Sequence, residues 1–121
     1  MKRENTKIGL YGEDLVCKHY INNGYRILDR NYRGNRGEID LIGYRNSILV
    51  FVEVKTRYNT YYGTPREAVN LSKQKKIKSI AKYYIHLKNL YNINVRFDVV
   101  EVFVNYSNNS YNINVIPNAF T

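Results

Sequence analysis

The sequence predicts an α/β fold in which a central mixed sheet of about five strands is flanked by helices. Apolar residues recur at helical spacing near the amino terminus and again after residue 70. The segments between and after these regions are short apolar runs typical of strands. The chain has 121 residues, which is enough for one domain and short for two. We therefore expect a single domain over residues 1–121.

Composition narrows the classes of function. The formal net charge is +9, which favours an anionic partner, nucleic acid first, although many small basic proteins bind no nucleic acid. Cys17 is the single cysteine and there are two histidines, so an internal disulfide is excluded and a zinc cluster is disfavoured. We see no signal peptide and no apolar run of membrane-spanning length, and we expect a cytoplasmic protein with no membrane partner.

The first helix is expected from about Thr6 to Asn23, and its apolar side is expected to contain Ile8, Tyr11, Leu15, Val16 and Ile21. Gly12 lies inside this helix, where glycine costs about 1 kcal/mol relative to alanine and often marks close packing. Glu13 lies on a mostly uncharged stripe of the same helix. It is either an acid that leans towards a site or an early glutamate that the helix dipole favours.

A short strand is expected from about Tyr25 to Tyr32. The loop after it is rich in glycine and arginine, so Arg33 and Arg36 either meet phosphates or belong to an ordinary solvated turn. Further on, Arg57 and Tyr58 begin a polar, aromatic loop. They could hold a nucleic-acid backbone and stack on bases, or the tyrosines of this loop could pack on the domain's own surface.

Two apolar runs, 37–42 and 48–57, flank a polar break at Asn46-Ser47 and predict a β-hairpin. With a two-residue turn there, the register opposes Tyr44 to Leu49, Gly43 to Val50, Ile42 to Phe51, Leu41 to Val52, Asp40 to Glu53, Ile39 to Val54 and Glu38 to Lys55. Alternation puts the odd-numbered residues of the first strand, Ile39 included, on a wholly apolar face and both acids on the other. A one-residue slip would move the acids to the apolar face, so this register is favoured.

Asp40 and Glu53 would then be directly opposed. At ~4 Å and an effective dielectric of ~20, two carboxylates repel by about 4 kcal/mol, so one keeps its proton or a cation lies between them. Oxygen ligands suit Mg²⁺ or Mn²⁺, and Lys55 would lie beside that ion on the same face. Such a centre can hydrolyse phosphodiesters. Alternatively, Glu53 and Lys55 are edge charges that keep a strand soluble, although the run before them reads as an interior strand.

Residues 64–67 predict a helix start, with Thr at the cap and Pro at the first position. Lys73 lies on the inward stripe of the following helical run, where a lysine needs an anion. The apolar members of that stripe are Ile77, Ile80, Ala81, Tyr84, Leu87 and Tyr91. Strands are expected at 95–104 and 111–116, the second at an edge of the sheet and ended by Pro117.

These residues carry a resemblance. Asp40 followed by Glu53-Val54-Lys55 resembles the core of the PD-(D/E)xK nuclease superfamily, with Ile39 where that name has proline. Nearly the whole chain is similar to the small bacterial YraN family, and only the final strand matches loosely. The matching segments are Gly9 to Glu13, Arg30 to Arg33, Gly37 to Ile42, Val50 to Arg57, Gly63 to Pro65, Ala68-Val69, Lys73 and Arg96 to Val100.

The resemblance implies a restriction endonuclease-like fold. It implies that Asp40 and Glu53 bind a metal, and the Val54 carbonyl would help them. It further implies Lys55 as the catalytic lysine and Glu13 as the extra acid of resolvase-like members. The supporting residues would be Glu38 and Lys73.

We therefore expect an endonuclease that uses Mg²⁺ or Mn²⁺ and acts on DNA, with a branched or single-stranded substrate and a homodimer as further expectations. Two alternatives stay open. The first is a nucleic-acid-binding module of the same fold that cuts slowly or not at all. The second is a structural subunit whose acid cluster is simply solvated.

Overall fold

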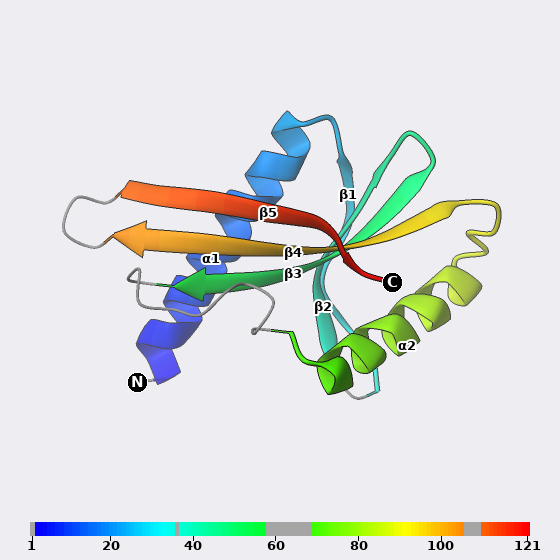
Figure 1. Cartoon of the computed structure of the whole chain (residues 1–121), viewed down its shortest axis with the longest axis horizontal. Helices are drawn as coiled ribbons and strands as arrows, with labels where there is room; N and C mark the ends of the chain where they lie inside the picture. The colour runs from blue at the N-terminus through cyan, green and yellow to red at the C-terminus, as the bar shows by residue number, and fades with distance from the viewer. Residues whose placement is uncertain (1, 36, 58–68, 106–109) are drawn as a thin grey trace.

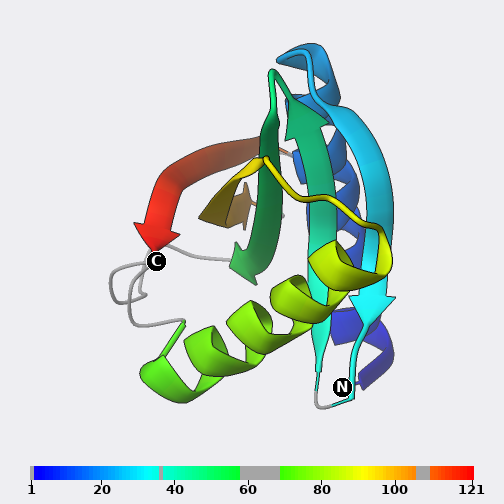
Figure 2. The same cartoon turned by 90° about the vertical axis from the view of Figure 1, so that its right-hand side faces the viewer.

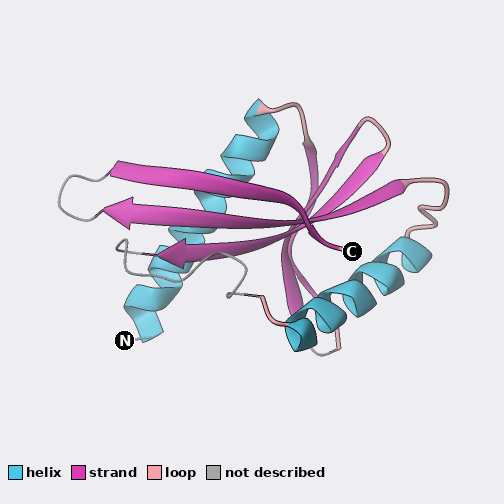
Figure 3. Ribbon diagram, in the orientation of Figure 1, coloured by secondary structure: helices cyan, strands magenta, loops and turns pink. Residues whose placement is uncertain are grey.

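The computed structural model describes residues 2–35, 37–57, 69–105 and 110–121, with the backbone alone for 2–10. Its elements, shown in Figure 1, are α1 (Lys2–Asn22), β1 (Arg26–Arg33), β2 (Glu38–Arg45), β3 (Ile48–Arg57), α2 (Leu71–Leu87), β4 (Asn94–Asn105) and β5 (Ser110–Phe120). The five strands form one sheet in chain order, and every neighbouring pair is antiparallel except β3 with β4. These features confirm the predicted α/β class, with a mixed sheet of five strands flanked by helices (Figure 3).

The two helices lie on opposite faces of the sheet, as the views in Figures 1 and 2 show together. Each face has its own apolar cluster. On the α2 face, Phe51 of β3 packs with helix residues such as Ile77 and Tyr84. On the α1 face, Val52 packs with helix residues such as Val16. Because β3 is central and covered on both sides, its side chains are apolar on both faces until the strand approaches Glu53.

Helix α1 presses closely against β3. A Cβ atom on Gly12 would overlap the hydroxyl of Thr56 and lie 3.1 Å from its Cβ, so the close approach requires glycine. The helix buries Val16 and its neighbours on the sheet side. The prediction that Tyr11 and Ile21 lie on the buried side is wrong, because these side chains are 43% and 52% exposed. The stripe that contains Gly12 faces the sheet instead.

The β2–β3 hairpin has the predicted register for the five pairs from Arg45–Ile48 to Leu41–Val52. Asn46 and Ser47 form the turn with φ of 51° and 63°, as a type I′ turn requires. The prediction for Ile39 is wrong: its side chain joins the α2 cluster, not the α1 cluster that holds Leu41. The paired segment of β1 contains Asn31 in a left-handed conformation (φ 51°), and such a residue interrupts the regular alternation of side chains.

Helix α2 begins at Leu71, where the Asn70 side chain caps it by accepting a hydrogen bond from the Lys73 amide at 2.9 Å. The predicted helix start at 64–67 lies outside the described residues. The prediction that Leu87 and Tyr91 belong to the inward stripe is wrong, since these residues are 52% and 58% exposed. The helix ends at Leu87, so the helical spacing does not carry on to Tyr91. Within the described residues, neither helix is long and apolar enough to cross a membrane.

Strand β5 lies at the edge of the sheet, as predicted, but Pro117 does not end it. The pairing with β4 shifts register between Phe97 and Val99, and this irregularity accommodates the proline. Asn118, with φ of 52°, donates its amide to the buried Asp98 carboxylate at 3.1 Å. The strand therefore continues to Phe120 because a buried acid satisfies the irregular backbone.

Candidate active site

The hairpin brings Asp40 and Glu53 together at the end of the β2–β3 ladder, one residue beyond the Leu41–Val52 pair. The two side chains belong to residues that are 8% and 6% exposed. The Asp40 carboxyl accepts a hydrogen bond from the Val54 amide at 2.7 Å and shares another with Glu53. The structure thus places side by side the two acids that the register opposes.

The Asp40 carboxyl holds a proton in this arrangement. Burial, and then the neighbouring charge of Glu53, raise the pKa of Asp40 to about 8. The hydrogen bond from the Val54 amide opposes this shift, because it favours the ionised carboxylate. The repulsion between the two acids can be relieved by a retained proton or by a cation. In the metal-free protein it is relieved by the proton on Asp40.

Two lysines approach the same oxygen of Glu53. The Nζ atom of Lys73, on α2, lies 3.0 Å from Oε1, whereas that of Lys55, on β3, lies 3.9 Å away. Burial lowers the pKa of Lys73, but the charge of Glu53, hydrogen bonds with Lys55 and Glu53, and the charge of Asp40 together raise it. Burial and the adjacent Lys73 lower the pKa of Lys55. The helix lysine is therefore the closer partner of Glu53, and Lys55 is the lysine that gives up its proton more readily.

Glu13 of α1 completes the acidic side of the site. Its Oε1 atom is buried and has no hydrogen-bond partner among the described residues. Burial, followed by the charge of Glu38, raises the pKa of Glu13, while a hydrogen bond with Asn31 opposes the shift. The charge of Glu13 in turn contributes to the raised pKa of Asp40, so the two groups are electrostatic neighbours. A buried carboxylate oxygen without a partner is costly and is relieved by a cation or a water molecule.

The carboxylate oxygens of this site suit a hard divalent ion that takes only one or two ligands from the protein. Among the described residues there is no group of three or more His, Cys, Asp or Glu arranged to hold a metal. Mg²⁺ typically takes one or two carboxylates and keeps several waters, so Asp40 and Glu53 suffice for it. The unpartnered oxygen of Glu13 supplies a further acceptor close by. The structure fixes Val54 through its amide, and a role for its carbonyl as a ligand stays a prediction.

The other residues predicted to support the site or to bind nucleic acid form ion pairs outside the acid pair, where the structure describes them. Glu38 is exposed and its carboxylate lies 3.8 Å from the guanidinium of Arg33, whose side chain is 87% exposed. Arg57, at the end of β3, lies 3.4 Å from the carboxylate of Glu101. Arg36 and Tyr58 lie outside the described residues.

Comparison with known proteins bears on this site. A family model described as "Uncharacterised protein family UPF0102" matches residues 12–102. The chain belongs to this family. The matched segment contains both acids of the pair, both lysines and Glu13.

Relatives of this UPF0102 protein match it over nearly its full length. A UPF0102 protein from Clostridium botulinum (strain Alaska E43 / Type E3) is 52% identical over 99% of this chain and 98% of that protein. A UPF0102 protein from Clostridium beijerinckii is 51% identical over the same shares of both chains. Among solved structures, a repair endonuclease from Pyrococcus abyssi aligns with a TM-score of 0.37 and 21% identity. That alignment covers 82% of this chain and 37% of the endonuclease.

Sequence reasoning missed Glu101 of the UPF0102 chain. Its residue is 1% exposed, and it lies beside Lys55 in the parallel β3–β4 register. It pairs with Arg57, which is thereby held at the end of β3. A signal was present, because an acid within the apolar run of β4 is unusual unless it has a partner.

Proposed function

We propose that this UPF0102 protein is a nuclease that uses Mg²⁺ or Mn²⁺ to hydrolyse phosphodiester bonds in DNA. The observation that carries the proposal is the buried pair of Asp40 and Glu53, which keeps a proton and is contacted by two lysines. Two crowded, buried acids destabilise the metal-free protein. A divalent cation would offset this cost, and their oxygen donors suit such an ion.

Each residue of the site has a place in this chemistry. A bound ion would polarise the phosphate and lower the pKa of a water molecule. Asp40 gives up its proton on loading, and the Val54 amide then holds the carboxylate in place. Lys73 orients Glu53 through their 3.0 Å ion pair. Lys55, with its lowered pKa, positions the water or stabilises the charge that develops on the phosphate.

Charge supports a nucleic acid as the substrate. The net charge of +9 gives the chain a long-range attraction to phosphates. Helix α2, which supplies Lys73, carries five lysines and no acidic residue over its 17 residues. The branched DNA and the homodimer expected from the resemblance belong to the same proposal. Sedimentation with and without four-way DNA tests both.

The second candidate is a nucleic-acid-binding module that does not cut. One observation favours it, since the net charge of +9 and the five lysines of α2 would attract phosphates whether or not a bond is cut. The two candidates differ in what Glu53→Gln does. A nuclease loses cleavage and metal binding together, whereas a binding module keeps its salt-sensitive DNA affinity and has no cleavage to lose.

The test is a cleavage panel of linear, nicked, flap and four-way DNA, plus RNA, with Mg²⁺ or Mn²⁺. We expect cleavage of DNA that requires the ion and disappears in Glu53→Gln. Asp14→Asn is the matched control, because it also removes one acid but at an exposed position paired to Arg30. Calorimetric titration of Mg²⁺ into wild type and Glu53→Gln reports metal binding directly. No cleavage of any substrate and no heat of Mg²⁺ binding in the wild type would refute the proposal.

A further inference from the structure

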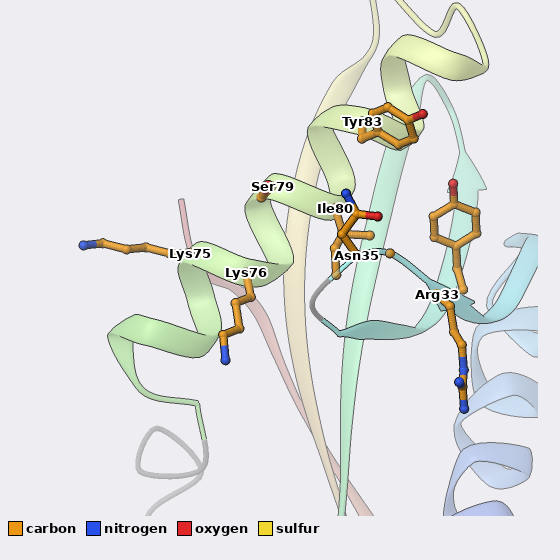
Figure 4. Close-up of a pocket in the computed structure, with 9 residues that line it drawn as sticks. Arg33, Asn35, Lys75, Lys76, Ser79, Ile80 and Tyr83 are labelled. Atoms are coloured by element: carbon orange, nitrogen blue, oxygen red, sulfur yellow. The ribbon is translucent and has the colours of Figure 1, made fainter.

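A second concave site lies where α2 meets the end of β1. It is a pocket of about 470 Å³ between the outer face of α2 and the end of β1 with the turn after it. Figure 4 shows Tyr83 and Lys76 projecting from the helix, and Arg33 projecting from the end of the facing strand, away from both. The volume falls within the range of about 300–1,000 Å³ that is usual for small-molecule and cofactor sites.

The floor of the pocket is fixed by close packing. A Cβ atom on Gly34 would lie 2.6 Å from Cγ1 of Ile80, so the turn rests directly on the helix. The amide of Gly34 donates to the carbonyl of Gly37 at 2.8 Å and closes the turn. Tyr32, also in the wall, packs edge-on against Tyr84 with ring centroids 4.9 Å apart. The pocket is therefore held open by the fold itself.

The side chains that face this pocket have two kinds of chemistry. Tyr83 is a large aromatic residue that is nevertheless 60% exposed, so one ring face is available for stacking. Arg33 and Lys76 are exposed cations at opposite sides of the pocket's rim. An aromatic ring with flanking cations suits a nucleotide, whose base stacks and whose phosphate is anionic.

The pocket continues towards the acid pair. A smaller hollow of about 340 Å³ is lined by Glu38 and Lys73, and it shares Lys76 and Ile80 with the larger one. Lys73 is the residue that pairs with Glu53. Along α2, ten residues separate Lys73 from Tyr83, a rise of about 15 Å. A stacked strand advances about 3.4 Å per nucleotide, so this rise corresponds to about four nucleotides.

We propose that this pocket binds one unpaired nucleotide of the DNA strand that is cut at the acid pair. The base stacks on Tyr83, and the phosphates of the adjoining backbone lie along α2 towards Lys76. This inference rests on the proposed nuclease function and specifies its substrate class. A base inside a duplex is paired and stacked and would have to be extruded to enter, so the pocket selects DNA with a single-stranded segment.

Binding is tested without cleavage, in EDTA, by the fluorescence anisotropy of labelled oligonucleotides. The probes are a short oligo(dT), the same strand with an abasic residue at each position in turn, and a duplex of equal length. We expect Tyr83→Ala to weaken oligo(dT) binding by roughly tenfold or more, the effect of one lost base–aromatic stack. Tyr83→Phe keeps the ring and should bind as wild type does. Tyr91→Ala, at a tyrosine of similar exposure outside the pocket, should change nothing.

The abasic scan identifies the base that stacks. At one position the abasic strand should bind the wild type as weakly as Tyr83→Ala binds oligo(dT), and the two changes together should add no further loss. An equal loss for duplex and single strand in Tyr83→Ala, or no sensitive position in the scan, would overturn the proposal. Displacement of oligo(dT) by an equal concentration of free thymidine monophosphate would also overturn it, because the pocket would then be a mononucleotide site.

The two proposals fail in different ways. If the wild type cuts DNA and Tyr83→Ala leaves single-strand binding unchanged, the pocket proposal is wrong and the nuclease stands. If single-strand binding depends on Tyr83 but neither Mg²⁺ nor Mn²⁺ yields any cleavage, the nuclease is wrong and the pocket stands as a binding site.

Discussion

Asp40→Asn should make the metal-free protein more stable, and increasingly so as the pH rises. The wild-type carboxyl has a folded-state pKa of about 8 against an ordinary value of 3.8. Across that interval the folded protein holds a proton that the unfolded chain has released, so the free energy of unfolding falls with rising pH. Asparagine cannot ionise, yet it can still accept from the Val54 amide and donate to Glu53. The variant therefore keeps the hydrogen bonds and loses the penalty.

The size of the effect follows from the shift in pKa. One proton contributes at most about 1.4 kcal/mol for each pH unit between the two pKa values. From about pH 5.5 to about pH 7.5, the variant should gain roughly 3 kcal/mol over wild type, which for a chain of this size is an increase in Tm of about 10 °C. The burial of Asp40, at 8% exposure, limits the screening that would reduce this figure.

Urea denaturation in EDTA at several pH values measures the effect. Asp14→Asn is the control, because it removes an equal charge from an exposed ion pair worth about 1 kcal/mol or less. Parallel stability–pH curves for wild type and Asp40→Asn between about pH 5.5 and pH 7.5 would show that the raised pKa of the acid pair is wrong.

Three further changes have defined outcomes. Gly12→Ala should lower the free energy of unfolding by about 1–3 kcal/mol in urea melts, because the new methyl group would meet Thr56; unchanged stability would contradict the close approach of α1 to β3. Tyr20→Phe should cost about 1.5–3 kcal/mol in the same assay, because the hydroxyl donates to the buried carboxylate of Asp98 at 2.6 Å; a neutral result would mean that this bond has no net value. Mg²⁺ should raise Tm more at about pH 8 than at about pH 6, because loading displaces the proton of Asp40; an equal rise at both values in calorimetric scans would argue against that coupling.

The hairpin and its acids could be predicted because their determinants are local. Two polar residues at Asn46-Ser47 fix the turn, and the turn fixes the register of both strands. The chain therefore encodes the proximity of Asp40 and Glu53 within a segment of fourteen residues, 40–53. The need of Lys73 for an anion was also evident from its place on an apolar stripe.

Other features depend on contacts that a single segment does not reveal. The side on which Ile39 packs is not fixed by the hairpin turn, because its side chain joins the cluster under α2, a helix that follows much later in the chain. The continuation of β5 past Pro117 depends on Asp98, a residue that is 1% exposed. Its carboxylate also accepts hydrogen bonds from two nitrogens of the Arg96 guanidinium. Such partners are distant in sequence or lie on other strands, and only tertiary packing selects them.

The two outer strands of the sheet have irregular pairing. The ladder of β1 with β2 shifts between Ile27 and Asp29, and that of β4 with β5 shifts between Phe97 and Val99, next to Pro117. Bulges and prolines at exposed borders obstruct the backbone pairing by which one sheet extends into another and seeds fibrous aggregates. We therefore expect two copies of this chain to meet through helices or loops and not through a continuous intermolecular sheet. The protein should then resist aggregation even where a polyanion concentrates many copies along its length.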